Sequence, residues 1–108
     1  MDNPEEVAYQ VLIDKYLADN AKFKQGSVVY FEHIVIKNNQ QRLKLSVGIV
    51  TEISLRKRLV ERGEHSYETH DIVYDIVSPK GLFKSVGECK VISASEFIYR
   101  EYLKQQPR

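Results

Sequence analysis

Apolar and polar residues alternate along the stretch from Lys44 to Leu59. Its odd positions are mostly apolar and its even positions mostly polar, which predicts a half-buried β-strand. At about 3.3 Å per residue this strand would be roughly 50 Å long, several times the usual length. We therefore expect it to bend, most easily at Gly48, so that its two ends belong to two sheets of a small barrel.

Helices are predicted at both ends of the chain. Asn3-Pro4-Glu5-Glu6 combines a capping residue, a first-position proline and acidic residues near the positive end of the helix dipole. The apolar spacing that follows predicts a helix to about Asp19, with one broad face buried. Ser93-Ala94-Ser95-Glu96 has the form of a capping box and predicts a second helix as far as Gln105.

Three further strands are predicted between the helices. The stretch 27–36 is apolar on both sides, so we expect both to be covered, one by the barrel interior and one by the N-terminal helix. A polar loop over 37–42 leads into the long strand. Residues 67–78 form the returning strand, with Ile72, Tyr74 and Ile76 facing inward. A turn at 78–81 precedes a strand over 82–92, interrupted at Gly87.

The far end of the long strand has two interpretations. Glu61-Arg62-Gly63-Glu64 is typical of a turn where the strand reverses. Alternatively, Leu55 to Arg62 is a short helix after Ser54, and Gly63 ends it. Three cations would crowd the positive end of that helix, which favours the strand.

Length and composition indicate one folded domain. The chain has 108 residues, 43% apolar and 29% charged, with a net charge of +1. We assign residues 1–20 to the N-terminal helix, 23–92 to the barrel and 93–105 to the C-terminal helix. The near-neutral charge does not by itself predict a polyanion partner. One cysteine, an acidic N-terminal segment and short apolar runs predict a cytoplasmic location, without membrane insertion.

The spacing of turn glycines and β-branched residues resembles a known architecture. It consists of Phe23-x-x-Gly26-x-Val28, Gly48-x-Val50-x-x-Ile53, Tyr74-x-Ile76 and Val86-x-Glu88-x-x-Val91. This pattern resembles an SH3-like barrel, and its middle element is similar to the glycine-centred motif of KOW and Tudor-type barrels. The whole order resembles short bacterial and bacteriophage proteins of unassigned role that carry a helix where 93–105 lies.

The resemblance implies a mainly β fold with flanking helices: an SH3-like, partly open β-barrel of order α-β-β-β-β-α with a long second hairpin. It implies a binding module rather than a catalyst. The chain departs from the pattern in its added N-terminal helix and longer hairpin. It also has no Trp, and no complete aromatic cage for methylated lysine can be placed. No binding residue is therefore carried over.

The long hairpin is the first candidate site. A small barrel does not need it for its core, and it projects apolar residues with little of the domain left to cover them. We expect a protein partner or a homo-oligomer to contact Leu55, Leu59, Val60 and Tyr67, with Arg56, Arg58 and Arg62 at the rim. The alternative is that the flanking helices fold onto the hairpin.

A nucleic-acid site is the second candidate, formed by Lys44, Arg56, Arg58 and Arg62. The returning arm, however, carries four acidic residues and no Lys or Arg between Gly63 and Ser78. Cross-strand pairing of opposite charges would then neutralise the basic arm. Both interpretations remain open at this point.

Metal and catalytic sites have little support in the sequence. His65 and His70 are separated by an odd number of residues and would face opposite sides of a strand, so we expect no metal site there with Asp71. His33 should be a hydrogen-bonded, partly buried strand residue, and Cys89 a small core residue in a strand. No nucleophile elbow, phosphate loop or zinc helix motif is present. We expect no enzyme activity, no cofactor and no small-molecule substrate.

The sequence thus predicts a non-catalytic protein-interaction or assembly module. We expect a bacterial or bacteriophage accessory or structural component, either cytoplasmic or part of a virion. A nucleic-acid-binding barrel that uses the basic arm of the hairpin is the alternative.

Overall fold

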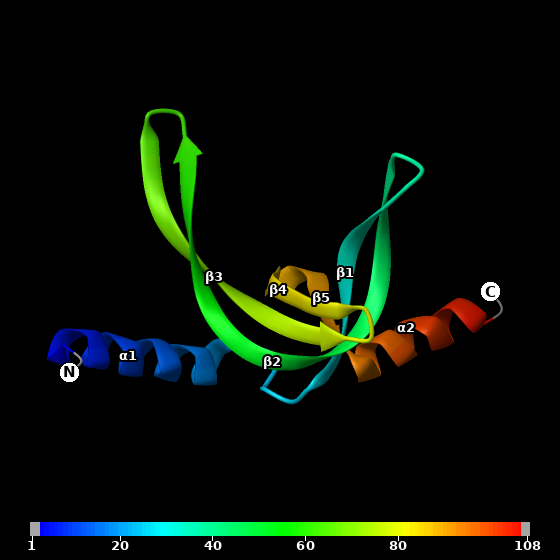
Figure 1. The fold of residues 1–108 in the computed structure, drawn as a ribbon, viewed down its shortest axis with the longest axis horizontal. Helices are drawn as coiled ribbons and strands as arrows, with labels where there is room; N and C mark the ends of the chain where they lie inside the picture. The colour runs from blue at the N-terminus through cyan, green and yellow to red at the C-terminus, as the bar shows by residue number, and fades with distance from the viewer. Residues whose placement is uncertain (1–2, 107–108) are drawn as a thin grey trace.

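The computed structural model describes residues 3–106 and shows a strongly curled antiparallel sheet with a helix at each side (Figure 1). The elements are α1 (Pro4–Asn20), β1 (Val28–Lys37), β2 (Gln40–Arg62), β3 (His65–Ser78), β4 (Gly81–Gly87), the 3-10 turn η1 (Glu88–Lys90), β5 (Val91–Ser93) and α2 (Ala94–Gln105). The mainly β, partly open barrel predicted from the sequence is confirmed. A fifth strand is added because the stretch 82–92 divides into β4, η1 and β5.

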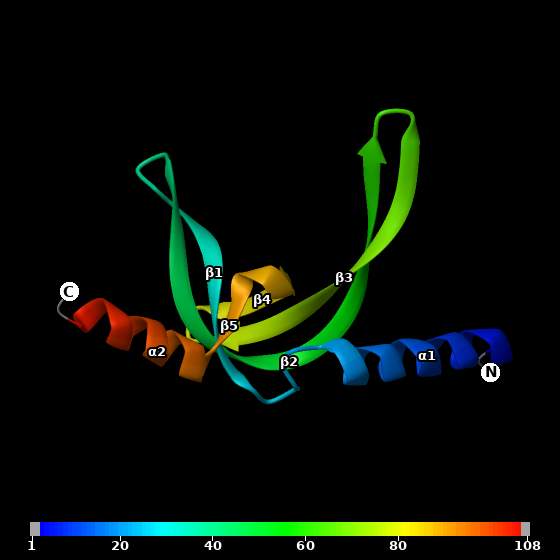
Figure 2. The ribbon, with the colours of Figure 1, turned by 180° about the vertical axis from the view of Figure 1, so that it is seen from behind.

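The strand β2 is the axis of the sheet, whose order is β4-β3-β2-β1-β5. Its first part pairs with β1 as far as Ile49, and its second part pairs with β3 from Ile49 to Arg62. The predicted long, bent strand is therefore confirmed, and the alternative helix over 55–62 is wrong. Both halves of β2 lie in one curled sheet rather than in two sheets, and two hairpins rise from its ends (Figures 1 and 2).

A β-bulge interrupts β2 at Thr51, between the pairs Val50–Ile76 and Glu52–Asp75. An extra residue in one strand shifts its alternation, so residues of the same parity before and after it face opposite sides of the sheet. Val50 and Ile53 accordingly both pack in the core although three positions separate them. The alternation predicted that the odd residues of β2 form one buried side, and this prediction is wrong.

Gly48 lies where β3 comes close to the backbone of β2. A Cβ atom at this position would lie 2.5 Å from Cγ2 of Ile76 and 2.6 Å from the carbonyl oxygen of Val77. Only glycine leaves room for this approach. The residue predicted as the bend is thus needed for close packing, and the register irregularity lies three residues further on.

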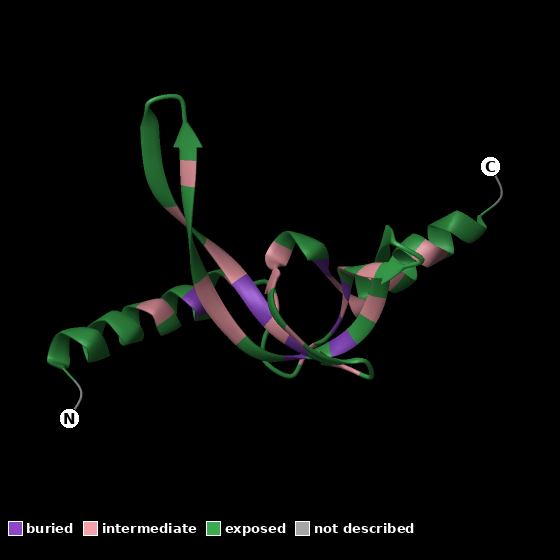
Figure 3. Cartoon of the chain, turned by 45° about the horizontal axis from the view of Figure 1, so that its top comes forward, coloured by how far each residue is buried: buried purple, intermediate pink, exposed green. Residues whose placement is uncertain are grey.

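The core lies inside the curl of the sheet and is small. Its buried residues are Val29, Phe31, Val50, Tyr74, Ile76 and Val91. Figure 3 shows buried positions at the base of the sheet and exposed positions over both hairpin tips. Tyr74 and Ile76 face inward as predicted, and Ile72 packs against the same cluster.

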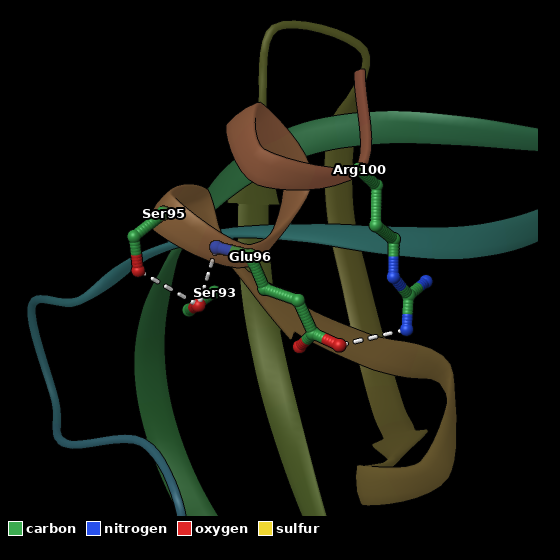
Figure 4. A network of polar contacts seen from close by, with 4 residues as sticks. All are labelled: Ser93, Ser95, Glu96 and Arg100. Atoms are coloured by element: carbon green, nitrogen blue, oxygen red, sulfur yellow. Dashed lines mark hydrogen bonds and ion pairs between the residues drawn. The ribbon is translucent and has the colours of Figure 1, made fainter. Parts of the chain in front are cut away.

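The two helices begin at the predicted residues. The side chain of Asn3 accepts a hydrogen bond from the amide of Glu5 at 3.0 Å, and Pro4 opens α1. In α2, Oγ of Ser93 accepts from the amide of Glu96 at 3.0 Å (Figure 4). The Glu96 carboxylate binds Arg100 at 2.7 Å instead of returning to the Ser93 amide, so the capping box is half formed.

Local turn chemistry explains the hairpin ends. Gly63 has φ 61° and reverses the chain between β2 and β3, and Gly81 has φ 127° at the end of the 78–81 turn. The predicted polar loop over 37–42 is wrong. Asn38 and Asn39 have φ values of 54° and 62° and form a two-residue turn, because asparagine tolerates the left-handed conformation.

The predicted burial of the N-terminal helix is also wrong. Leu17 is its buried residue, whereas Val11 and Leu12 are 60% and 65% exposed. Apolar residues occur on all sides of α1, so no single face can be buried against the sheet. The molecule is correspondingly extended: its dimensions are 57 × 37 × 31 Å, and its radius of gyration is 17.5 Å, against about 13 Å for a compact domain of this length.

Candidate interaction surface

The convex side of the curled sheet carries a continuous group of exposed apolar side chains, here called the outer apolar face. Its members, each between 36% and 70% exposed, are Val28, Ile34, Ile36, Leu43, Leu45, Val47, Ile49, Val77 and Leu82. The strand register joins them, since Ile34 lies opposite Leu43 and Val28 lies opposite Ile49. Ile49 in turn lies opposite Val77, and Val77 opposite Leu82.

The bulge at Thr51 explains why these residues are outside. Before it, the even residues Gly48 and Val50 face the core, so the odd apolar residues face outward. Strand β1 follows the same division: Val29 and Phe31 are fully buried, whereas its even apolar residues lie on the convex side. The expectation that α1 covers this side of β1 is wrong.

The outer apolar face is large for a monomer. If each of its nine side chains exposes on the order of 100 Å², the face measures about 900 Å². The largest apolar patch of a typical monomer is about 300–600 Å². One protein-protein interface covers about 800 Å² on each partner. The size of this face is therefore typical of an interaction surface.

The helix α2 covers one border of this face. The ring of Phe97 stacks on that of Tyr30, with centroids 3.9 Å apart and planes 15° apart. Between α2 and the β1–β2 hairpin lies a groove of about 330 Å³, whose apolar lining includes Leu43, Leu45 and Ile92. The contact orients α2 along the edge and leaves most of the outer apolar face open.

The predicted contact residues of the β2–β3 hairpin do not form one patch. By strand alternation, Leu55 and Leu59 lie on the side that continues into the core. Val60 lies opposite Tyr67 on the other side, which also carries the three rim arginines. Leu59 is 61% exposed and Tyr67 48% exposed. The hairpin projects as predicted (Figure 1), but its predicted contact residues lie on two opposite sides of the ribbon.

The alternative prediction, that the flanking helices fold onto this hairpin, is only partly correct, because α1 lies beside the hairpin but does not pack against it. An open gap of about 490 Å³ lies between the two, lined by Tyr9, Leu12, Ile13 and Tyr16 of α1 and by Leu55, Glu68, Thr69 and His70 of the hairpin. The helix thus runs beside the base of the hairpin without closing onto it.

Cross-strand charge pairing accounts for two of the four candidate nucleic-acid residues. The Asp71 carboxylate lies 3.2 Å from Arg58 and 4.0 Å from Arg56. Arg62 lies opposite His65 near the tip. Lys44 is on the other hairpin, opposite His33, so the structure does not bring it together with the arginines. It lies instead beside Lys80, whose pKa it lowers.

The polar centre of the fold is a buried tyrosine. The hydroxyl of Tyr74 donates to the carboxylate of Glu88 at 2.6 Å and accepts from the amide of Phe23 at 3.3 Å. The same carboxylate oxygen accepts from the amide of Lys22 at 3.2 Å. Burial, followed by the hydrogen bond to Glu88, raises the pKa of Tyr74. This network fastens the segment after α1 to η1.

The remaining candidate side chains have structural explanations. His33 is partly buried, as predicted, and Nε2 lies 2.7 Å from Oγ of Ser46. Cys89 is exposed in η1, so its prediction as a core strand residue is wrong, because the chain leaves the sheet after Gly87. Within residues 3–106, no three His, Cys, Asp or Glu side chains are close enough to share a metal ion.

The sequence did carry a signal for the outer apolar face, because the stretch 27–36 is apolar on both sides. We interpreted that pattern as a strand covered on both sides by its own chain. Over the part of the chain described, neither helix has the length and apolar content needed to cross a membrane. No protein-family model, curated protein or solved structure matches the chain.

Proposed function

We propose that this protein is a non-catalytic protein-interaction and assembly module. The outer apolar face carries the proposal. Nine large apolar side chains lie in register across β1, β2, β3 and β4, and most are about half exposed or more. Contact with another polypeptide would remove this apolar surface from water, which stabilises the complex by roughly 25 cal/mol for each Å² buried.

The extended shape supports the same function. The two hairpins and two helices project from a core of six buried residues (Figures 1 and 3). Projecting elements add little to the stability of an isolated chain but enlarge the surface available to partners. The SH3-like resemblance agrees with a binding module. We extend the proposal to a bacterial or bacteriophage accessory or structural component, located in the cytoplasm or in a virion.

The β2–β3 hairpin is a second contact element in this proposal. Val60 and Tyr67 would form a small apolar contact at its tip with Arg62 beside them, while Leu55 and Leu59 would meet a partner from the other side. Its mixed charges and smaller apolar area favour the outer apolar face as the main contact.

Two measurements test the proposal: light scattering of the purified intact chain, and cross-linking in the cells that naturally produce it. Ile34→Glu with Leu43→Glu, two directly opposed exposed residues, should lose the wild-type assembly or cross-linked partner. The variant should keep its circular dichroism spectrum and melting temperature. The hairpin variant, Leu59→Asp with Val60→Asp, should weaken the assembly or the cross-link to the partner less than the outer-face variant does. If the outer-face variant keeps both the wild-type mass and the wild-type cross-links, the proposal is wrong.

The second candidate function is nucleic-acid binding, and the specific observation that favours it is the row of three arginines on one side of the β2–β3 hairpin, Arg56, Arg58 and Arg62. The Asp71 carboxylate pairs with Arg56 and Arg58, which leaves the row with a net positive charge that phosphate groups could bind. Anisotropy titration against single- and double-stranded oligonucleotides across salt concentrations tests it. A steep salt dependence that Arg58→Gln with Arg62→Gln reduces would support it, and no binding at low salt would exclude it.

A further inference from the structure

We propose that the outer apolar face is covered by α1 of a second copy of this chain, in a head-to-tail contact. This inference rests on the proposed assembly function and names the partner. Both surfaces belong to the same chain and both are exposed. They lie toward opposite ends of the long axis (Figures 1 and 2), so they cannot meet within one molecule.

The helix α1 has the properties of a buried element. Apolar residues occur around its whole circumference, a pattern found in helices surrounded by protein. Its exposed large members are Val7, Tyr9, Val11, Leu12 and Tyr16, between 46% and 65% exposed. Its own chain buries Leu17 near its C-terminal end. The outer part of α1 therefore lacks the covering that its composition requires.

The two surfaces match in length and shape. The 17 residues of α1 give a rod about 25 Å long. The outer apolar face follows β1 from Val28 to Ile36, a distance of roughly 30 Å. A second convex face would touch the convex sheet only along a narrow strip. A helix can lie along the twisted surface beside α2, where Leu43 and Leu45 line part of a groove of about 330 Å³.

The charges are complementary. Residues 4–20 carry four carboxylates and one lysine, whereas 32–44 in the β1–β2 hairpin carry Lys37, Arg42 and Lys44 against one carboxylate, Glu32. Alternation places these cations on the other side of the ribbon from the apolar residues. They would attract the acidic helix and guide it onto the hairpin.

The contact area is that of a weak interface. The exposed residues lie on two sides of α1, Val7 and Val11 on one and Tyr9, Leu12 and Tyr16 on the other, so one sheet face covers at most three of them, about 300 Å² at on the order of 100 Å² each. An equal area of the facing sheet gives about 600 Å² in total, below the roughly 1,000 Å² of a stable interface and typical of a weak contact. Each copy would make this contact twice, once with its helix and once with its face. A heterologous contact of this kind produces rings or filaments.

A mixing experiment tests the arrangement. The helix variant is Val11→Lys with Leu12→Lys, which keeps the face intact. The face variant is Ile34→Glu with Leu43→Glu, which keeps the helix intact. Each variant alone should be a monomer of 12.6 kDa. Their equimolar mixture should give a heterodimer of about 25 kDa, twice the chain mass, since one good helix and one good face remain.

The control is Ile98→Lys with Tyr99→Lys, an adjacent pair on α2 with exposures of 65% and 60% that match those of Leu12 and Val11. It should keep the mass of the wild-type assembly. A wild-type chain that stays monomeric at all concentrations overturns the inference. So does a helix variant that keeps the wild-type mass, or a mixture that stays monomeric.

The outcomes separate the inference from the proposed function. If only the face variant disassembles, the face is an interface but α1 is not its occupant, and the inference alone fails. A monomeric wild type whose outer-face cross-links lead to a different protein also refutes only the inference. If the face variant changes neither mass nor cross-links, both proposals fail.

Discussion

The hydroxyl of Tyr74 donates a 2.6 Å hydrogen bond to the carboxylate of Glu88, and both side chains lie at the centre of the polar network in this fold. Tyr74 is fully buried, and its ring meets that of Phe23 edge to face at 5.6 Å between centroids. Glu88 belongs to η1, the short turn between β4 and β5. This one pair therefore links the middle of the sheet, the end of the α1 segment and the chain leading to β5.

Replacement of Tyr74 by phenylalanine should destabilise the protein. It removes the hydroxyl but keeps the ring, and so leaves the Glu88 carboxylate and the Phe23 amide without this partner. We expect a loss of about 1–3 kcal/mol in the free energy of unfolding, measured by urea denaturation. Tyr99→Phe, at a 60% exposed site, should change it by less than about 0.5 kcal/mol. Equal effects at both sites would contradict the role of the network.

The raised pKa of Tyr74 predicts a loss of stability at alkaline pH. In the unfolded chain this hydroxyl ionises near its ordinary value of 10.0, whereas in the folded protein its pKa lies well above that value. Above about pH 10 the unfolded state therefore binds fewer protons, and unfolding becomes more favourable as pH rises. Denaturation midpoints from pH 8 to 11 should fall above pH 10 in the wild type and fall less steeply in Tyr74→Phe. Parallel curves would contradict this.

Gly48→Ala should be among the most destabilising small substitutions. The new methyl group would meet the Val77 carbonyl oxygen at 2.6 Å, and that backbone atom cannot move without disturbing β3. We expect a loss of about 1–3 kcal/mol or more, as for other overpacked sites. Gly87→Ala is the matched control, because its Cβ would meet only Sγ of Cys89 at 3.9 Å. Thermal melting of both variants measures the difference.

Asp71→Asn should have little effect on stability. The carboxylate pairs with Arg56 and Arg58, which are 50% and 60% exposed, and such pairs contribute roughly 0–1 kcal/mol. The substitution also frees two cations, so it separates the two candidate functions. Oligonucleotide affinity should rise if the basic arm binds nucleic acid and stay at the background level if the protein is an assembly module.

Local chemistry was sufficient to predict much of this fold. Asn3 and Pro4 begin the first helix, Ser93 caps the second, and Gly63 and the 78–81 turn end hairpins where expected. Each depends on one residue type with a restricted conformational or hydrogen-bonding role. The length of β2 was predicted for a similar reason, because sustained alternation extends through it.

The orientation of the sheet faces was not predictable in the same way. The bulge at Thr51 reverses the alternation, and no glycine or other marker in the sequence distinguishes that position. The apolar residues of the first half of β2 were therefore assigned to the inside. The exposure of α1 was not predicted because the apolar composition of the helix indicates burial. The sequence of one chain does not show whether the element that covers such a helix belongs to the same chain or to another one.

Chemical labelling of one position on the outer apolar face tests the central claim most directly. Val47→Cys, in a Cys89→Ser background, places a thiol in the middle of this face without removing a core residue. Glu64→Cys in the exposed β2–β3 turn provides the reference rate. If α1 of a second copy covers the face, labelling at position 47 should be at least tenfold slower than the reference at high protein concentration and approach it on dilution. Labelling at the reference rate at every concentration would contradict the account.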